Sequence, residues 1–106
     1  MYFVVNETLA MGKGKIASQV GHGAIEAFRR HPPTLLFQKW DSGNNAKIVL
    51  RAPKETLMAL ADKYSHLSRL IIDAGRTQVE PGSVTVLVFN IMEKDSNPDL
   101  LKLKLL

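Results

Sequence analysis

The first residues that could do chemistry are Lys13 and Lys15, in the glycine-spaced start of MGKGKIASQVGHG, residues 11–23. A P-loop requires Lys-Ser or Lys-Thr after its second glycine, and the spacing Gly-Lys-Gly-Lys-Ile does not supply it. A looser anion site stays open, because free N–H groups and the dipole at a helix N-terminus favour negative charge.

A polar arc follows on the helix that we expect from about residue 15 to residue 30. At about 100° per residue, an arc of roughly 60° holds Lys15, Gln19, His22 and Glu26. The arc is either the solvated face of an amphipathic helix or a functional face. Gly21 and Gly23 favour a functional face. Each glycine destabilises a helix by about 0.5–1 kcal/mol relative to alanine, and each lets a ligand or another backbone come close. Tight packing of a second helix would also explain these glycines.

Asp73 begins the second cluster, Asp-Ala-Gly-Arg-Thr, directly after the apolar residues 70–72. Ligand sites in α/β sheets form at the carboxyl ends of strands, and this carboxylate lies at such an end. A turn-stabilising aspartate paired with Arg76 is the alternative. Ser18 or Ser83 could serve as nucleophile, but the chain has no Gly-x-Ser-x-Gly elbow, so a serine hydrolase is disfavoured.

The composition removes further classes of function. The absence of cysteine excludes disulfides, thiol catalysis and thiolate metal sites, and His22 has no second ligand at metal spacing on its helix. No apolar run approaches the ~20 residues of a membrane span, and the first six residues lack a signal-peptide layout. The net charge of +4 favours an anionic partner, of which nucleic acid is the commonest.

Alternating strands and helices must position the two clusters. We expect strands at 2–5, 47–51, 69–73 and 84–91, and helices at 15–30, near 35–40 and after Pro53. A helical turn at 97–99 and an extended tail at 101–105 should follow. The order β-α-α-β-α-β-β predicts a single α/β domain over residues 1–106, with helices covering a small, mostly parallel sheet. Both polar loops should then lie on the same rim of the sheet.

Together the two clusters resemble the type-two peptidyl-tRNA hydrolase family of archaea and eukaryotes. The family pattern combines a Met-Gly-Lys-Gly-Lys loop, a Gln-x-x-His-Ala-like helix and an Asp-Ala-Gly-Arg-Thr-Gln loop followed by Pro-Gly-Ser/Thr. This chain carries MGKGKIASQVGHGA and DAGRTQVEPGSVTVL, and LFQKWDSGNNAKIVLRAP matches the family's Trp-containing helix and second strand. The resemblance covers nearly the whole chain.

The resemblance implies a three-layer α/β/α fold with a four-stranded mixed sheet, a homodimer and no metal or organic cofactor. It implies cleavage of the ester between a peptide and the 3′-terminal ribose of tRNA. Because the chain begins at the first strand, without the N-terminal anchor of some eukaryotic members, we expect a cytoplasmic protein. A non-catalytic adaptor of the same fold, which binds tRNA or a protein, is the alternative.

The resemblance also implies roles for eight residues. Asp73 would orient or deprotonate water, directly or through His22, and Lys15 would hold the developing oxyanion or a nearby phosphate. Gln19 and Thr77 would position the ester, and Lys13 and Arg76 would contact the tRNA backbone. The expected catalytic residues are Lys15, His22, Asp73 and Thr77, and the expected substrate-binding residues are Lys13, Gln19, Arg76 and Gln78.

Three departures from the family pattern stand out. Residue 23 is glycine where the family usually has alanine, and the segment at 61–73 is shorter than usual. FNIMEKDSNPD, residues 89–99, replaces the customary Gly-Pro loop. This third change affects whatever that loop contributes to substrate or dimer contacts.

Overall fold

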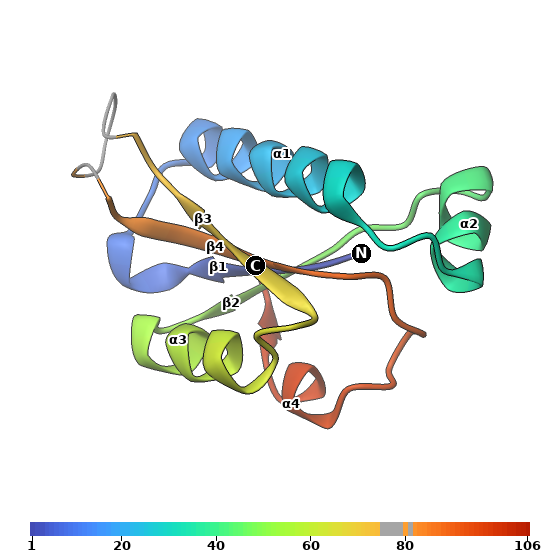
Figure 1. Cartoon of the computed structure of the whole chain (residues 1–106). Coiled ribbons are helices and arrows are strands. Elements are labelled where there is room, and N and C mark those ends of the chain that lie inside the picture. Colours follow the sequence, from blue (N-terminus) through green and yellow to red (C-terminus); the bar gives the residue numbers. More distant parts are fainter. Residues whose placement is uncertain (75–79, 81) are drawn as a thin grey trace.

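The computed structural model describes residues 1–74, 80 and 82–106, and within them a five-stranded sheet forms the middle of the molecule (Figure 1). The strands lie in the order β3-β4-β1-β2-β5. Their bounds are β1 Tyr2–Asn6, β2 Ile48–Ala52, β3 Ser68–Ile72, β4 Val84–Phe89 and β5 Lys104–Leu105. Strand β1 is buried along its whole length, as its aromatic and β-branched residues favour.

The directions of the strands decide which ends meet at an edge of the sheet. Strand β1 pairs with β2 in parallel, whereas the pairs β1–β4, β3–β4 and β2–β5 are antiparallel. The expectation of a mostly parallel sheet is therefore wrong, because β4 returns between β3 and β1. The predicted shared rim still holds, since β1, β2 and β3 all run in the same direction.

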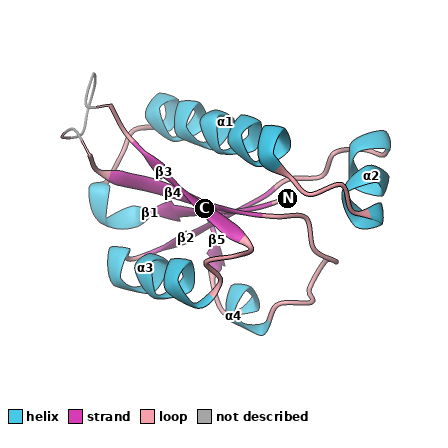
Figure 2. Cartoon of the chain, viewed as in Figure 1, coloured by secondary structure: helices cyan, strands magenta, loops and turns pink. Residues whose placement is uncertain are grey.

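Helices cover both faces of the sheet and give the three layers that the family resemblance implies. Helix α1 lies over one face, and α3 and α4 lie over the other (Figures 1 and 2). Helix α2 lies beyond the C-terminal end of α1. The bounds are α1 Lys13–Arg30, α2 Leu35–Ser42, α3 Lys54–Lys63 and α4 Pro98–Leu101, with a 3-10 turn, η1, at Glu7–Leu9.

The period of two along β1 divides the core between these layers. Tyr2 and Val4 point to the face covered by α3 and α4, where they pack with Leu57 and Leu100. Phe3 and Val5 point to the other face and pack in the cluster that contains Ala27 of α1. The polar rim of the sheet therefore stands on a core that is closed on both sides.

The described sheet has one strand more than the four predicted. Residues of the expected extended tail form β5, which pairs with Leu50 and Arg51 of β2, and the Leu106 N–H donates to the Val49 carbonyl at 3.0 Å. The expected helical turn is α4, which Asn97 caps by accepting from two backbone N–H groups. The predicted order β-α-α-β-α-β-β therefore lacks α4 and β5. The alternation of Leu and Lys indicates an extended tail, but it does not indicate that this tail pairs with β2.

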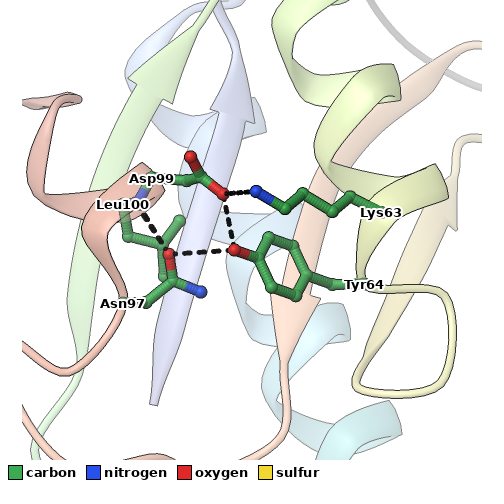
Figure 3. A network of polar contacts seen from close by, with 5 residues as sticks. All are labelled: Lys63, Tyr64, Asn97, Asp99 and Leu100. Carbon is green, nitrogen blue, oxygen red and sulfur yellow. Dashed lines mark hydrogen bonds and ion pairs between the residues drawn. The ribbon is translucent and has the colours of Figure 1, made fainter.

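A polar network joins α4 to the end of α3 (Figure 3). The Lys63 ammonium donates to Asp99 Oδ2 at 2.7 Å, and the Tyr64 hydroxyl donates to the same oxygen. Asn97 Oδ1 accepts from the backbone N–H groups of Asp99 and Leu100. The network ties the C-terminal segment to the body of the molecule.

Candidate active site

Asp73 lies at the rim where β3 ends, and the backbone holds it there. Its N–H donates to the Ser83 carbonyl at 2.9 Å, and its carbonyl accepts from the Gly82 N–H at 3.0 Å. Gly82 has a φ of 83°, a conformation that glycine adopts without strain. These contacts extend the pairing of β3 with β4 by one step and fix the backbone from which the Asp73 side chain extends.

Lys15 faces Asp73 from the first turn of α1. Gly12 precedes this helix in an extended conformation, and Met11 anchors the preceding loop in the core beneath α1. The Lys15 ammonium donates to Asp73 Oδ1, and the two side chains are only 8% and 4% exposed. Two distant segments, one after β1 and one after β3, therefore form a buried ion pair, as the shared rim predicted.

Gln19 holds the same carboxylate, and Thr85 holds Gln19 in turn. The Gln19 amide nitrogen, one turn after Lys15, donates to Asp73 Oδ1 at 3.3 Å. The Thr85 hydroxyl, from β4, lies 2.6 Å from Gln19 Oε1 and donates to it, and the Ile71 carbonyl is a second acceptor at 3.2 Å. Gln19 and Thr85 are both buried. This chain of hydrogen bonds orients the Asp73 carboxylate relative to α1 and β4.

Thr85 is a site residue that the sequence analysis missed. The signal was available, because Thr85 is the one polar residue in the strand VTVLVF. A buried hydroxyl in an apolar strand needs a partner, and the side chains that can supply one mark a polar site in the core. Which partner it takes depends on α1 crossing β4, and that crossing is not visible in the local sequence.

A cleft of about 810 Å³ opens beside this buried cluster, between α1 and β3. It is lined by the whole predicted arc, Lys15, Gln19, His22 and Glu26, together with Asp73. His22 is exposed in the cleft one turn beyond Gln19, and Glu26 forms an ion pair with Arg30 at 3.0 Å. The arc is therefore one wall of a cleft, rather than a helix face in open solvent.

Lys13, another of the expected site residues, does not join this group. Lys13, the first residue of α1, is exposed and lines a different groove with Lys47, on another side of the helix. Its side chain therefore does not reach the Asp73 cleft. Arg76, Thr77 and Gln78 lie outside the described residues.

The arrangement suits an addition reaction at a carbonyl group. A carboxylate held by a cation and an amide can orient water, and the cation can stabilise negative charge that develops on oxygen. Among residues 1–74, 80 and 82–106, no group of three or more His, Cys, Asp or Glu side chains is placed to hold a metal ion. No helix in this part of the chain is both long and apolar enough to cross a membrane.

Comparison with known proteins gives consistent matches. The family model described as "Peptidyl-tRNA hydrolase PTH2" matches residues 1–106. The chain is 45% identical over 95 residues to "Peptidyl-tRNA hydrolase 2, mitochondrial" of Homo sapiens, covering 82% of this chain and 52% of that protein. It is 47% identical over 94 residues to "Probable peptidyl-tRNA hydrolase 2" of Drosophila melanogaster, covering 82% and 50%.

A third relative matches over more of its own length. The chain is 38% identical over 100 residues to "Peptidyl-tRNA hydrolase" of Haloquadratum walsbyi, covering 91% of this chain and 88% of that protein. The chain thus spans about half the length of the two animal relatives and most of the length of the third.

Proposed function

The chain belongs to the peptidyl-tRNA hydrolase PTH2 family, and we propose that it hydrolyses the ester between a peptide, or an N-substituted amino acid, and the 3′-terminal ribose of tRNA. The products are free tRNA and the peptide acid. The observation that carries this proposal is the buried pair of Lys15 and Asp73 at the wall of a cleft. An ester hydrolase needs an oriented water beside a group that stabilises an oxyanion, and this pair offers both.

In the proposed reaction the oxygen of a water molecule attacks the ester carbonyl carbon. Asp73 accepts a hydrogen bond from this water and takes its proton, either directly or through His22. The tetrahedral oxyanion is stabilised by the Lys15 ammonium, which already lies beside the carboxylate. The bond between the carbonyl carbon and the ribose oxygen then breaks, and the ribose oxygen receives the proton that Asp73 or His22 took from the water.

Gln19 has a positioning role in this scheme. Its amide bridges Asp73 and Thr85, so it keeps the carboxylate turned toward the Lys15 side of the cleft. We further propose that Thr77 and Gln78 position the ester and that Arg76 contacts the tRNA backbone. These three roles rest on the family resemblance.

The test is release of a labelled N-acetylated amino acid from tRNA by the purified chain. Because we propose that no metal or organic cofactor takes part, the reaction contains EDTA. The Asp73→Asn variant, purified in the same way, shows whether the activity belongs to this chain. Tight tRNA binding without any release would instead favour the adaptor.

Three further expectations from the sequence belong to this proposal: a single domain, a homodimer and a cytoplasmic location. Coincident unfolding transitions by two spectroscopic probes would support a single domain. Light scattering after gel filtration gives the mass in solution. Cell fractionation decides the location. The alternative to the cytoplasm is the mitochondrion, because the Homo sapiens relative is named mitochondrial.

A further inference from the structure

The cleft continues past Asp73 along α1 and ends in a group of arginines. Arg29 and Arg30 of α1 and Arg69 of β3 line the end of the cleft opposite to Lys15. From Lys15 to Arg29 the helix advances by about 21 Å at 1.5 Å per residue. Because β3 runs back along α1, its first residues lie beside the end of that helix (Figure 1). We call Arg29, Arg30 and Arg69 the arginine end of the cleft.

Positive charge at this end is only partly neutralised. Glu26 is the carboxylate that lines this half of the cleft, and it pairs with Arg30. Arg29 is exposed and has no ion-pair partner among the described residues. Lys15, at the other end, is neutralised by Asp73. The cleft is therefore balanced where the proposed chemistry occurs and cationic at its far end.

Arg69 lines the cleft with a guanidinium whose donors are only partly satisfied. Its Nε is a buried nitrogen with no hydrogen-bond partner in the described part of the chain, and its Nη2 reaches only the Arg30 carbonyl, at 3.5 Å. A buried donor without an acceptor is rare in proteins, and a guanidinium can only donate. Arg29 and Arg30 also complement the dipole at the end of α1, but Arg69 comes from a strand, so the dipole does not explain it.

We propose that the arginine end binds phosphates of the tRNA strand that leads to the 3′-terminal ribose. This inference rests on the proposed function, which places the ester of that ribose beside Asp73. Guanidinium groups match phosphate oxygens with paired N–H donors, and a row of them along a cleft follows a strand without reading its bases. The strand then runs along α1 from Arg29 toward Lys15.

The alternative course for the strand is the groove on the other side of α1. Lys13 and Lys47 flank that groove, and its remaining lining is Ile16, Ala17, Val20, Gly21, Ala24, Val49 and Leu106. Apolar side chains and glycine offer no donors to phosphate, so we place the strand on the arginine side. The two courses predict different variants to be defective.

The experiment compares three double variants that each remove two positive charges. Arg29→Gln with Arg69→Gln tests the arginine end, and Lys13→Gln with Lys47→Gln tests the other groove. Lys54→Gln with Lys102→Gln, in α3 and after α4 on the opposite face, is the control. Each is assayed on N-acetyl-aminoacyl-tRNA and on N-acetyl-aminoacyl-adenosine, which carries the ester but no phosphate.

We expect the arginine variant to raise KM for the tRNA substrate by about tenfold or more, with kcat unchanged. The slope of log affinity against log salt should become shallower by about 1 for each arginine removed. Turnover of the adenosine ester should equal that of the unaltered chain. Arg29→Gln alone, at an exposed position, should give part of the effect and guards against misfolding at Arg69.

An unchanged KM and salt slope in the arginine variant would overturn the inference, as would an equal loss on both substrates. A defect confined to the Lys13 and Lys47 variant would move the strand to the other groove. Failure of the unaltered chain to cleave either ester would refute the proposed function instead. Binding of deacylated tRNA, followed by fluorescence anisotropy, would still decide the arginine contact in that case.

Discussion

At the scale of single residues, Asp73 is the group on which the proposed chemistry depends most. Asp73→Asn keeps the size of the side chain and removes its charge, so turnover should fall by at least about 100-fold. The same change leaves Lys15 charged and buried without its counterion, which typically costs about 3–5 kcal/mol. We therefore expect a folded but less stable variant.

Two measurements separate these effects of Asp73→Asn. Circular dichroism and urea unfolding define the conditions in which the variant is folded, and kcat is measured there on N-acetyl-aminoacyl-tRNA. Asp62→Asn, at an exposed position of α3, is the matched control. Turnover at the level of the unaltered chain would remove Asp73 from the reaction.

His22 raises a different question, namely which group takes the proton. It is exposed in the cleft, so His22→Ala should leave the fold intact. If His22 relays the proton, the acid limb that a histidine produces at about pH 6–7 should vanish from the pH–rate profile. His66→Ala, in the turn after α3, is the control. A limb that persists in His22→Ala would leave Asp73 as the base.

Among the elements, α1 contacts the core at one of its two central glycines. Gly23 packs on the sheet, and a Cβ added there would lie 3.5 Å from side-chain atoms of Ile71 and Phe3, an ordinary contact distance. Gly21 has nothing within 4 Å of such a Cβ. Packing of a second helix, one of the two explanations offered by the sequence, is therefore wrong, since strand side chains face Gly23.

Gly23→Ala should therefore stabilise the protein. Alanine loses less conformational entropy on folding than glycine, which lowers the free-energy cost by about 0.5–1 kcal/mol. The new methyl group also fills space between α1 and the sheet. We expect an increase of about 1 kcal/mol in the free energy of unfolding, or about 4–8 °C in Tm. Gly21→Ala is the control for helix propensity alone. A Gly23→Ala variant less stable than the unaltered chain would show that the contact at 3.5 Å is too close.

At the scale of the whole molecule, the α3–α4 network links stability to pH. The hydrogen bonds from Lys63 and Tyr64 lower the pKa of Asp99 below its ordinary 3.8. The hydrogen bond and charge of Asp99 raise the pKa of Lys63 above 10.5. A lowered carboxyl pKa gives stability that is fully present above about pH 4 and is lost as the pH falls through the value in the folded state. The raised Lys63 pKa gives stability that is lost in strong alkali.

Asp99→Asn should remove the Asp99 contribution to this profile. Urea unfolding between pH 2 and pH 7 should show a smaller loss of stability on acidification for the variant than for the unaltered chain. Asp95→Asn, which lies in the preceding loop, is the control. Identical acid profiles for Asp99→Asn and the unaltered chain would show that the network adds nothing to stability in solution.

Local sequence patterns predict β1 to β4, α1 to α3 and the polar arc, but not β5 as a strand of the sheet. The aromatic and β-branched run at the start predicts β1, His31-Pro32-Pro33 ends α1, and the spacing of Lys15, Gln19 and His22 places them on one face. These features follow from propensity and periodicity, which act over a few residues. Asp73 could be placed at the end of a strand for the same reason.

The contacts that these residues make depend on the tertiary structure. The return of β4 between β3 and β1 brings Thr85 under Gln19, and the crossing of α1 over β3 puts Arg69 beside Arg30. The tail became β5 because the chain returns to β2 across the face covered by α3 and α4. Pairings between distant segments depend on how apolar faces are buried together, and many arrangements of the same elements satisfy the local pattern equally well.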